Sequence, residues 1–228
     1  MYNVLVLITV LGLAVVLATA ADDDPDLSQV SLRGVFYQGT GCGAGSVSGS
    51  IPQDKQRYMV WLLIVIPLLM VYSFTLIFDL YRVEVSPTAP ITAVRKNCLI
   101  LVDLTYPAGI QYSIPNTTFV GDATLDAGVA LSQQVSYYYT GREEASSTNM
   151  TIEGPKSSHF EVTDQHPYSA WESTWWSPCG QPQSLNINSR VSLKKTTANA
   201  TGVFPADLAG GLLGQFSWIT GLVWRRCA

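Results

Sequence analysis

Charged residues are scarce in this chain. Asp, Glu, Lys and Arg make up 13% of its 228 residues, about half the share of an ordinary soluble domain. The net charge of −4 excludes a general nucleic-acid binder, which needs clustered Lys and Arg for phosphate contacts. Disorder throughout is excluded because 47% of the residues are hydrophobic. The length suits one β-rich domain, or at most two small ones.

Motifs of the common catalytic classes are also missing. The sequence has no G-x-S-x-G, no H-E-x-x-H and no C-x-x-C, and the glycines of residues 39–45 lack G-x-G-x-x-G spacing. It has only two histidines, His159 and His166, which we expect near a surface loop. We therefore expect no catalytic residues, no metal site and no cofactor, and a binding protein more than an enzyme.

The N-terminus has the pattern of a secretory signal peptide. Residues 4–17 are apolar except for Thr9 and Gly12, and they lead into the small-residue cleavage pattern Ala18-Thr19-Ala20. We expect a signal helix over residues 1–20, cleavage after Ala20, and a disordered acidic stretch over residues 21–27. Because the first three residues carry no Lys or Arg, a membrane anchor is the alternative. The signal predicts a secreted, extracellular protein.

Secretion makes the cysteines and the glycosylation sequons informative. In an oxidising compartment the default for four cysteines is two disulfides, and the cysteines are Cys42, Cys98, Cys179 and Cys227. Of the three possible pairings we favour Cys42–Cys98 with Cys179–Cys227. These bonds would cross-link the N-terminal and the C-terminal parts of the chain separately. N-glycosylation is predicted at the sequons of Asn116, Asn149 and Asn199.

A second apolar segment does not fit a secreted protein. Residues 58–78 carry no charge and are long enough to span a membrane. A span would separate Cys42 from the other cysteines and leave all three sequons in the cytosol, so topology argues against it. The alternatives are a hydrophobic helical insertion over residues 57–73, or a translated intron. Arg57-Tyr58 can be encoded by AGG-TAT, with an intron donor, and Tyr72-Ser73 by TAC-AGT, with an acceptor.

The remaining chain alternates apolar and polar residues as half-buried strands do. The clearest windows are residues 129–139, 185–194, 98–106 and 77–85. Shorter candidates are residues 30–37, 46–51, 118–125, 149–153, 159–163 and 221–225. About ten strands with Gly and Pro between them predict an all-β fold, an antiparallel β-sandwich of jelly-roll type, as a single domain over residues 28–228.

An aromatic cluster is the most suggestive local feature. Trp171, Trp175 and Trp176 precede the third cysteine, and exposed indoles can stack on sugar rings. The alternative is that they pack the core beside a disulfide. Of the tyrosines at residues 137–139, alternation predicts two buried and one exposed.

Carboxylates on one strand are poor catalytic partners. Asp122 and Asp126 would lie about 13 Å apart, beyond the roughly 5–9.5 Å of glycosidase pairs. A hydrolase would have to assemble carboxylates such as Asp79, Asp103 and Glu161 across strands.

The order of several short segments resembles a known family, domain of unknown function 4360. The segments include Tyr37-Gln38-Gly39-Thr40-Gly41-Cys42, Phe74-Thr75-Leu76-Ile77-Phe78-Asp79, Trp176-Ser177-Pro178-Cys179-Gly180 and Leu222-Val223-Trp224-Arg225-Arg226-Cys227. The resemblance covers roughly residues 28–227. It implies a small secreted protein of the kind found mainly in fungi, and it transfers no catalytic residue because the family has no established activity.

One departure from the family pattern bears on the apolar segment. In the family, the Phe74–Asp79 strand follows the glycine–serine strand after a short polar hairpin, whereas residues 57–73 intervene here. The extra residues coincide with the intron-like interval, which favours a translated intron.

Together these observations predict a secreted, disulfide-bonded, glycosylated protein. Its expected role is non-catalytic binding at the cell wall or in the extracellular medium, with polysaccharide or a host component as partner and no nucleic acid. The alternatives are a secreted hydrolase acting on wall polysaccharide and a surface protein anchored in the membrane by residues 58–78.

Overall fold

A computed structural model describes residues 27–52, 71–142, 145–166, 175–179, 182–206 and 215–227. The predicted signal helix, the acidic stretch up to residue 26, residues 53–70 with the first part of the apolar segment, and Trp171 lie outside the described residues.

Strands dominate the regular secondary structure of the described chain. The strands are β1 (Ser31–Gln38), β2 (Val47–Ser50), β3 (Val71–Phe78), β4 (Val83–Val85), β5 (Arg95–Thr105), β6 (Ile110–Ser113), β7 (Asn116–Leu125), β8 (Val129–Tyr139), β9 (Ala145–Glu153), β10 (Lys156–Gln165), β11 (Leu185–Lys195), β12 (Gly202–Phe204) and β13 (Phe216–Arg226). A short 3-10 helix, η1 (Ile91–Ala93), precedes β5.

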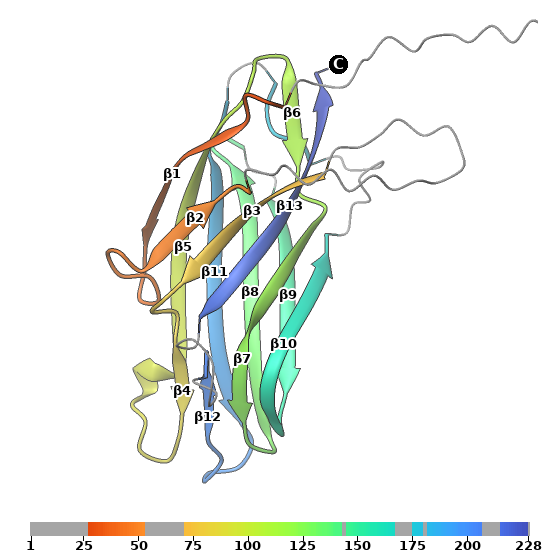
Figure 1. The fold of residues 1–228 in the computed structure, drawn as a ribbon. Coiled ribbons are helices and arrows are strands. Elements are labelled where there is room, and N and C mark those ends of the chain that lie inside the picture. Colours follow the sequence, from red (N-terminus) through yellow and green to blue (C-terminus); the bar gives the residue numbers. More distant parts are fainter. Residues whose placement is uncertain are drawn as a thin grey trace, which may run out of the picture.

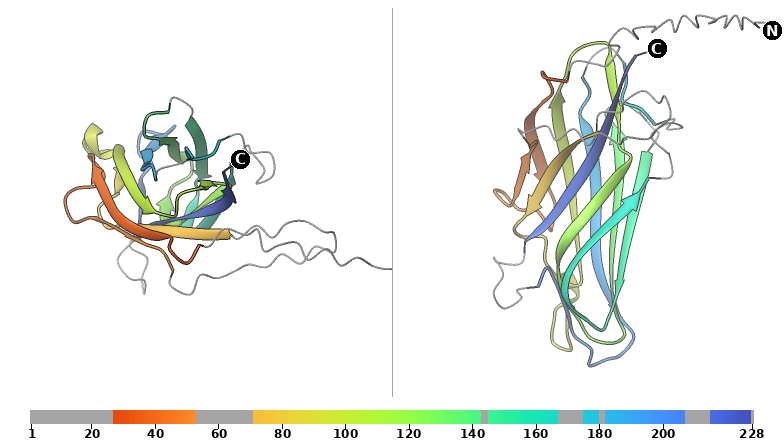
Figure 2. Two further views of the ribbon diagram at one scale, coloured as in Figure 1. Left: turned by 90° about the horizontal axis from the view of Figure 1, so that it is seen from above. Right: turned by 45° about the vertical axis from the view of Figure 1, so that its right-hand side comes forward.

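The strands form two antiparallel sheets packed face to face. One sheet has the order β1-β5-β11-β8-β9; the other has the order β2-β3-β13-β7-β12-β4, with β10 paired to β7 and β6 paired to β13. In Figure 1 the strands β3, β13 and β7 cross in front of the steeper β5, β11 and β8, and the view from above in Figure 2 shows the two layers. The predicted antiparallel β-sandwich is confirmed.

Alternation of side chains builds the core between the sheets. Along β8 and β11 every second residue is buried, since successive side chains of a strand point to opposite faces. Tyr137 and Tyr139 are buried and Tyr138 is half-buried, as predicted. The largest fully buried side chains are mostly aromatic, and Trp218, Tyr81, Tyr112, Phe78, Phe119 and Phe216 are among them.

The second apolar segment is not one long helix. Its last part, from Val71, is strand β3, which pairs with β13 from Val71↔Val223 to Phe78↔Phe216. The predicted helical insertion over residues 57–73 is therefore wrong for residues 71–73. Among the described residues no helix is long and apolar enough to cross a membrane.

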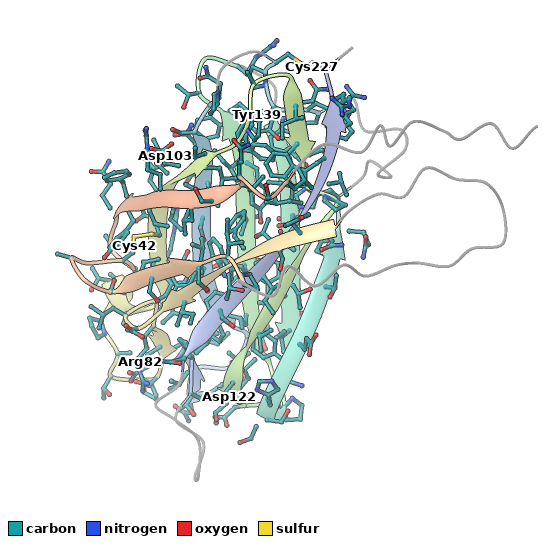
Figure 3. All side chains as sticks on the ribbon, turned by 45° about the horizontal axis from the view of Figure 1, so that its top comes forward. Cys42, Arg82, Asp103, Asp122, Tyr139 and Cys227 are labelled. Carbon is teal, nitrogen blue, oxygen red and sulfur yellow. A yellow bond between two sulfur atoms is a disulfide. The ribbon has the colours of Figure 1, made fainter. Side chains whose placement is uncertain are left out.

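Two disulfides connect the strands to neighbouring loops. Cys42 bonds Cys98 of β5, and Cys179 bonds Cys227, which follows β13. These are the pairs favoured from the sequence. Figure 3 places Cys42 beside the β1 and β2 region and Cys227 at one end of the sandwich, close to Tyr139, with Asp122 towards the other end.

Candidate functional site

The outer face of the five-stranded sheet carries a register-matched set of aromatic, aliphatic and amide side chains. We name it the aromatic–amide face. Its first row crosses β1, β5, β11 and β8 and consists of Phe36, Leu101, Asn186 and Tyr138. Its second row, one rung along, consists of Gln38, Leu99, Asn188 and Ser136. Neither row contains a charge.

Phe36 is the most unusual residue of this face. Its side chain is 63% exposed, and among the described residues the other large exposed hydrophobic side chains, Leu80, Ile91 and Ile219, are aliphatic. A Cβ added at Gly34 would lie 3.2 Å from the Phe36 ring, so the ring lies over the backbone of that glycine. The glycine thus lets an aromatic ring lie close to the sheet surface.

Amides surround the aromatic side chains. Asn186 Nδ2 donates to Thr140 Oγ1 at 2.9 Å, which fixes the orientation of its carbonyl oxygen. Asn188 is exposed, and its amide makes no side-chain hydrogen bond with other described residues. Amides both donate and accept, so this face can pair with hydroxyl groups while its rings contact apolar surface.

The outer face of the other sheet has a different chemistry. One of its rungs aligns Thr75, Ile219 and Thr118, and the next aligns Ile77, Ser217 and Val120. Hydroxyls and aliphatic side chains alternate there, and these two rungs contain no aromatic ring. The aromatic–amide face is therefore the more distinctive of the two.

A cavity of about 250 Å³ lies at the end of the sandwich that carries Cys227. It is lined by Gln111, Tyr139, Arg142, Trp175, Trp176, Ser177, Pro178, Cys179 and Arg225. These residues come from β6, from β8 and the turn after it, from β13, and from the segment 175–179, which packs against β6. Ser177 N donates to Tyr112 O at 2.8 Å, and Tyr112 N donates to Ser177 Oγ at 2.9 Å.

Arg225 is the central charged residue of this cavity. Its guanidinium carbon lies 3.9 Å from the centroid of the Trp176 ring, a cation–π contact. Gln111, opposite Arg225 in the β6–β13 register, lies 2.7 Å from Cys179 Sγ. A disulfide sulfur has no hydrogen to donate, so the amide nitrogen faces the sulfur, and Oε1 accepts from Arg225 Nε and Nη2. Partial loss of hydration lowers the pKa of Arg225, which remains charged.

The other walls of the cavity are aromatic and already packed. Trp175 is 4% exposed and stacks on Tyr139 with ring centroids 4.4 Å apart. The indole of Trp175 therefore packs the cavity wall, as the alternative from the sequence has it, and ligand stacking at these tryptophans stays a prediction. Trp176 is half-buried and lines the cavity. Burial raises the pKa of Tyr139 well above its ordinary value, so this phenol is neutral.

The carboxylates named for a hydrolase are not brought together. Asp103 lies on β5 in one sheet and forms an ion pair with Arg33. Glu161 lies on β10 in the other sheet. Asp79 follows β3, which is separated from β10 by β13 and β7, and three strand spacings amount to about 14 Å. Asp126 accepts from Thr201 N and Oγ1, both at 2.8 Å, and these bonds lower its pKa.

The two histidines have different surroundings. His159 is exposed and its Nδ1 lies 3.0 Å from Asp122 Oδ1. His166, expected near the surface, is instead buried, with Nδ1 2.7 Å from Ser146 Oγ. A serine beside a histidine is a nucleophile–base pattern, but both side chains are buried, so a substrate does not reach the hydroxyl in this conformation. No group of three or more His, Cys, Asp or Glu in the described ranges could hold a metal ion.

The three sequons lie at different parts of the surface. Asn199 is exposed in the turn between β11 and β12, Asn149 is exposed on β9, and Asn116 is half-buried at the start of β7. The exposed positions of Asn199 and Asn149 leave room for a glycan.

Similar proteins were found among solved structures at low identity. The module TmCBM61 in complex with β-1,4-galactotriose is 10% identical, covers 86% of this chain and 91% of its own, and has a TM-score of 0.23. A family 11 carbohydrate-binding module from Clostridium thermocellum, in complex with a β-1,3-1,4-mixed-linked tetrasaccharide, is also 10% identical, covers 86% of this chain and 95% of its own, and has a TM-score of 0.23. Likenesses at this level carry no argument about ligand.

Sequence relatives are more informative. An uncharacterized secreted protein of Arthroderma benhamiae is 35% identical over 203 residues, which cover 89% of this chain and 74% of the relative. Together with the two disulfides, this shows a secreted, extracellular protein. The model of the family described as domain of unknown function (DUF4360) matches residues 28–227. The chain therefore belongs to the DUF4360 family.

Proposed function

We propose that this protein is a non-catalytic extracellular binding protein that holds a neutral polysaccharide chain on its aromatic–amide face. The observation that carries the proposal is the exposed ring of Phe36, aligned across four strands with Leu101, Asn186 and Tyr138. A sugar ring has an apolar face of C–H groups and a rim of hydroxyls, which match an aromatic platform beside amide groups.

The dimensions of the face favour a chain over a single sugar. The first row crosses three strand spacings, which amount to about 14 Å, and the second row lies directly beside it. Neither row contains a charged side chain, and the exposed Arg190 lies on the same face only beyond Asn188, so the surface of the two rows themselves is neutral. The expected ligand is therefore an uncharged polymer of hexose or N-acetylhexosamine units.

The test is a binding isotherm of the purified protein on cellulose, chitin and β-1,3-glucan. Phe36→Ala and Tyr138→Ala should each weaken binding to the preferred polymer about tenfold, the equivalent of about 1.4 kcal/mol. Ile91→Ala is the matched control, because Ile91 is 86% exposed in η1, away from the face. It should leave binding unchanged.

Two results would contradict the proposal. One is that the wild-type protein binds none of the polymers, and the other is that Ile91→Ala weakens binding as much as Phe36→Ala does. The same samples are assayed for new reducing ends. A progressive release of sugar by the wild-type protein would show that it is a hydrolase and not a non-catalytic binding protein.

A further inference from the structure

We infer that the cavity at the Cys227 end is a second binding site, for the carboxylate of an acidic sugar such as a hexuronate. It is distinct from the aromatic–amide face, and its ligand would be negatively charged, whereas the face would bind an uncharged polymer. The inference stands on the cavity, on the two guanidiniums that line it, and on the hydrogen bonds that occupy the other polar groups.

Positive charge in the cavity lining is not neutralised by described residues. Arg142 and Arg225 both line the cavity, and no carboxylate is among its described lining residues. The ion pairs Arg33–Asp103 and His159–Asp122 involve neither arginine. Two cations around one hollow favour an anionic ligand, since a guanidinium pairs with a carboxylate through parallel N–H···O bonds.

The remaining polar groups are already engaged. Gln111 Oε1 accepts from Arg225, Ser177 Oγ accepts from Tyr112 N, and Tyr139 OH donates to Tyr112 O at 3.0 Å. Because Gln111 Oε1 accepts one hydrogen each from Nε and Nη2 of Arg225, both hydrogens of Nη1 and the second hydrogen of Nη2 remain to meet a ligand. The cavity therefore offers mainly donors, which suits an acceptor such as a carboxylate.

The size and walls of the cavity narrow the ligand further. A volume of about 250 Å³ lies below the roughly 300–1,000 Å³ of sites for drug-sized ligands, so one sugar ring fits better than a chain. Trp176 and Pro178 supply apolar surface beside the charges, which a sugar ring can cover and a bare inorganic anion cannot. An acidic monosaccharide, either free or at the end of a polymer, satisfies both features.

The test is calorimetric titration of the disulfide-intact protein with D-glucuronate and D-galacturonate. Arg225→Gln and Arg142→Gln should each weaken binding at least tenfold, and raised salt should weaken wild-type binding. Arg95→Gln removes the same charge from an exposed position at the start of β5 and should leave binding unchanged. Arg142 follows β8, outside the sheets, so its replacement tests the site even if the Arg225 variant folds poorly.

Controls separate this inference from the proposed function. Methyl β-D-glucoside should not bind the cavity, and Phe36→Ala should bind glucuronate as the wild type does. The site would be overturned if the wild type binds no uronate. It would also be overturned if Arg225→Gln and Arg142→Gln bind uronate as tightly as the wild type does. Acetate binding as tightly as glucuronate would overturn its assignment to a sugar. Tighter binding of a disaccharide with a terminal uronate identifies a polymer end as the source, and equal binding identifies the free acid.

Discussion

The buried histidine should make the fold sensitive to acid. His166 is 4% exposed, and its ring contacts Tyr137 with centroids 5.1 Å apart. Its Nδ1 hydrogen-bonds Ser146 of the five-stranded sheet, while Nε2 lies 3.5 Å from Thr117 Oγ1 in the other sheet. Burial lowers the pKa of His166 from 6.5 to about 4, opposed in part by the nearby charge of Asp164.

The sign and size of the effect follow from proton linkage. The unfolded chain binds a proton at His166 near pH 6.5, whereas the folded protein binds it only near pH 4, so acid favours unfolding. The contribution of the neutral His166 ring to the free energy of unfolding is complete above pH 6.5. It is lost at up to about 1.4 kcal/mol per pH unit as the pH falls towards 4. The full loss is about 3 kcal/mol, equivalent to a fall of roughly 10 °C in Tm for a domain of this size.

Urea unfolding monitored by tryptophan fluorescence, at pH values from 4 to 7.5 with the disulfides intact, measures this loss. His166→Gln removes the titrating ring and should flatten the pH dependence of the free energy of unfolding between pH 4 and 6.5. His159→Gln is the matched control, because it removes the exposed histidine, and it should retain the wild-type dependence. If His166→Gln and the wild type lose stability in parallel over this interval, the reasoning about His166 is refuted.

Three further outcomes are expected. Replacing Cys42 and Cys98 together by Ala should cost about 4 kcal/mol on the chain-entropy model, because the bond closes a sequence separation of 56; an unchanged urea midpoint would contradict this. Asn199→Gln should increase the gel mobility of the secreted protein by one glycan, and glycosidase treatment should abolish the difference; equal mobility before treatment would show that the sequon is unused. Peptide mapping of the secreted protein should find a peptide in which a single Ser joins Gln56 to Phe74, because the AG left from the Arg57 codon and the T left from the Ser73 codon read AGT; intact peptides from residues 58–78 would refute the translated intron.

Strand positions could be predicted where apolar and polar residues alternate over the same residues that pair with a neighbouring strand. Residues 129–139 were predicted as a strand and are β8, with the same bounds. Residues 77–85 were predicted as one strand, but β3 ends at Phe78 and β4 begins at Val83. Tyr81 between them is still buried and bonds Ser189. Burial alternates through this irregular segment, so periodicity alone does not reveal the break.

The cavity was only partly accessible to sequence reasoning. Trp175 and Trp176, two of the tryptophans before Cys179, line the cavity, but the sequence alone leaves open whether they stack on a ligand or pack a wall. Strand β6 was missed because all four of its residues are buried. The segment 175–179 covers β6, with Ser113 Oγ donating to Trp175 O at 2.7 Å, and this contact removes the alternation that marks a half-exposed strand. Arg225 and Gln111 meet only through the β6–β13 register, which the sequence does not reveal.

The register of β2 and β3 bears on the origin of residues 57–73. The two strands pair from Val47↔Phe78 to Ser50↔Thr75, and one more rung would place Ile51 opposite Phe74. If residues 57–73 are removed, Pro52 to Gln56 remain as the connection, within the usual length of a hairpin loop. Removing residues 57–73 also removes the first three residues of β3, 71–73, which pair with β13 and not with β2. Because the remaining connection is long enough to join β2 to Phe74, we propose that the natural chain lacks the segment.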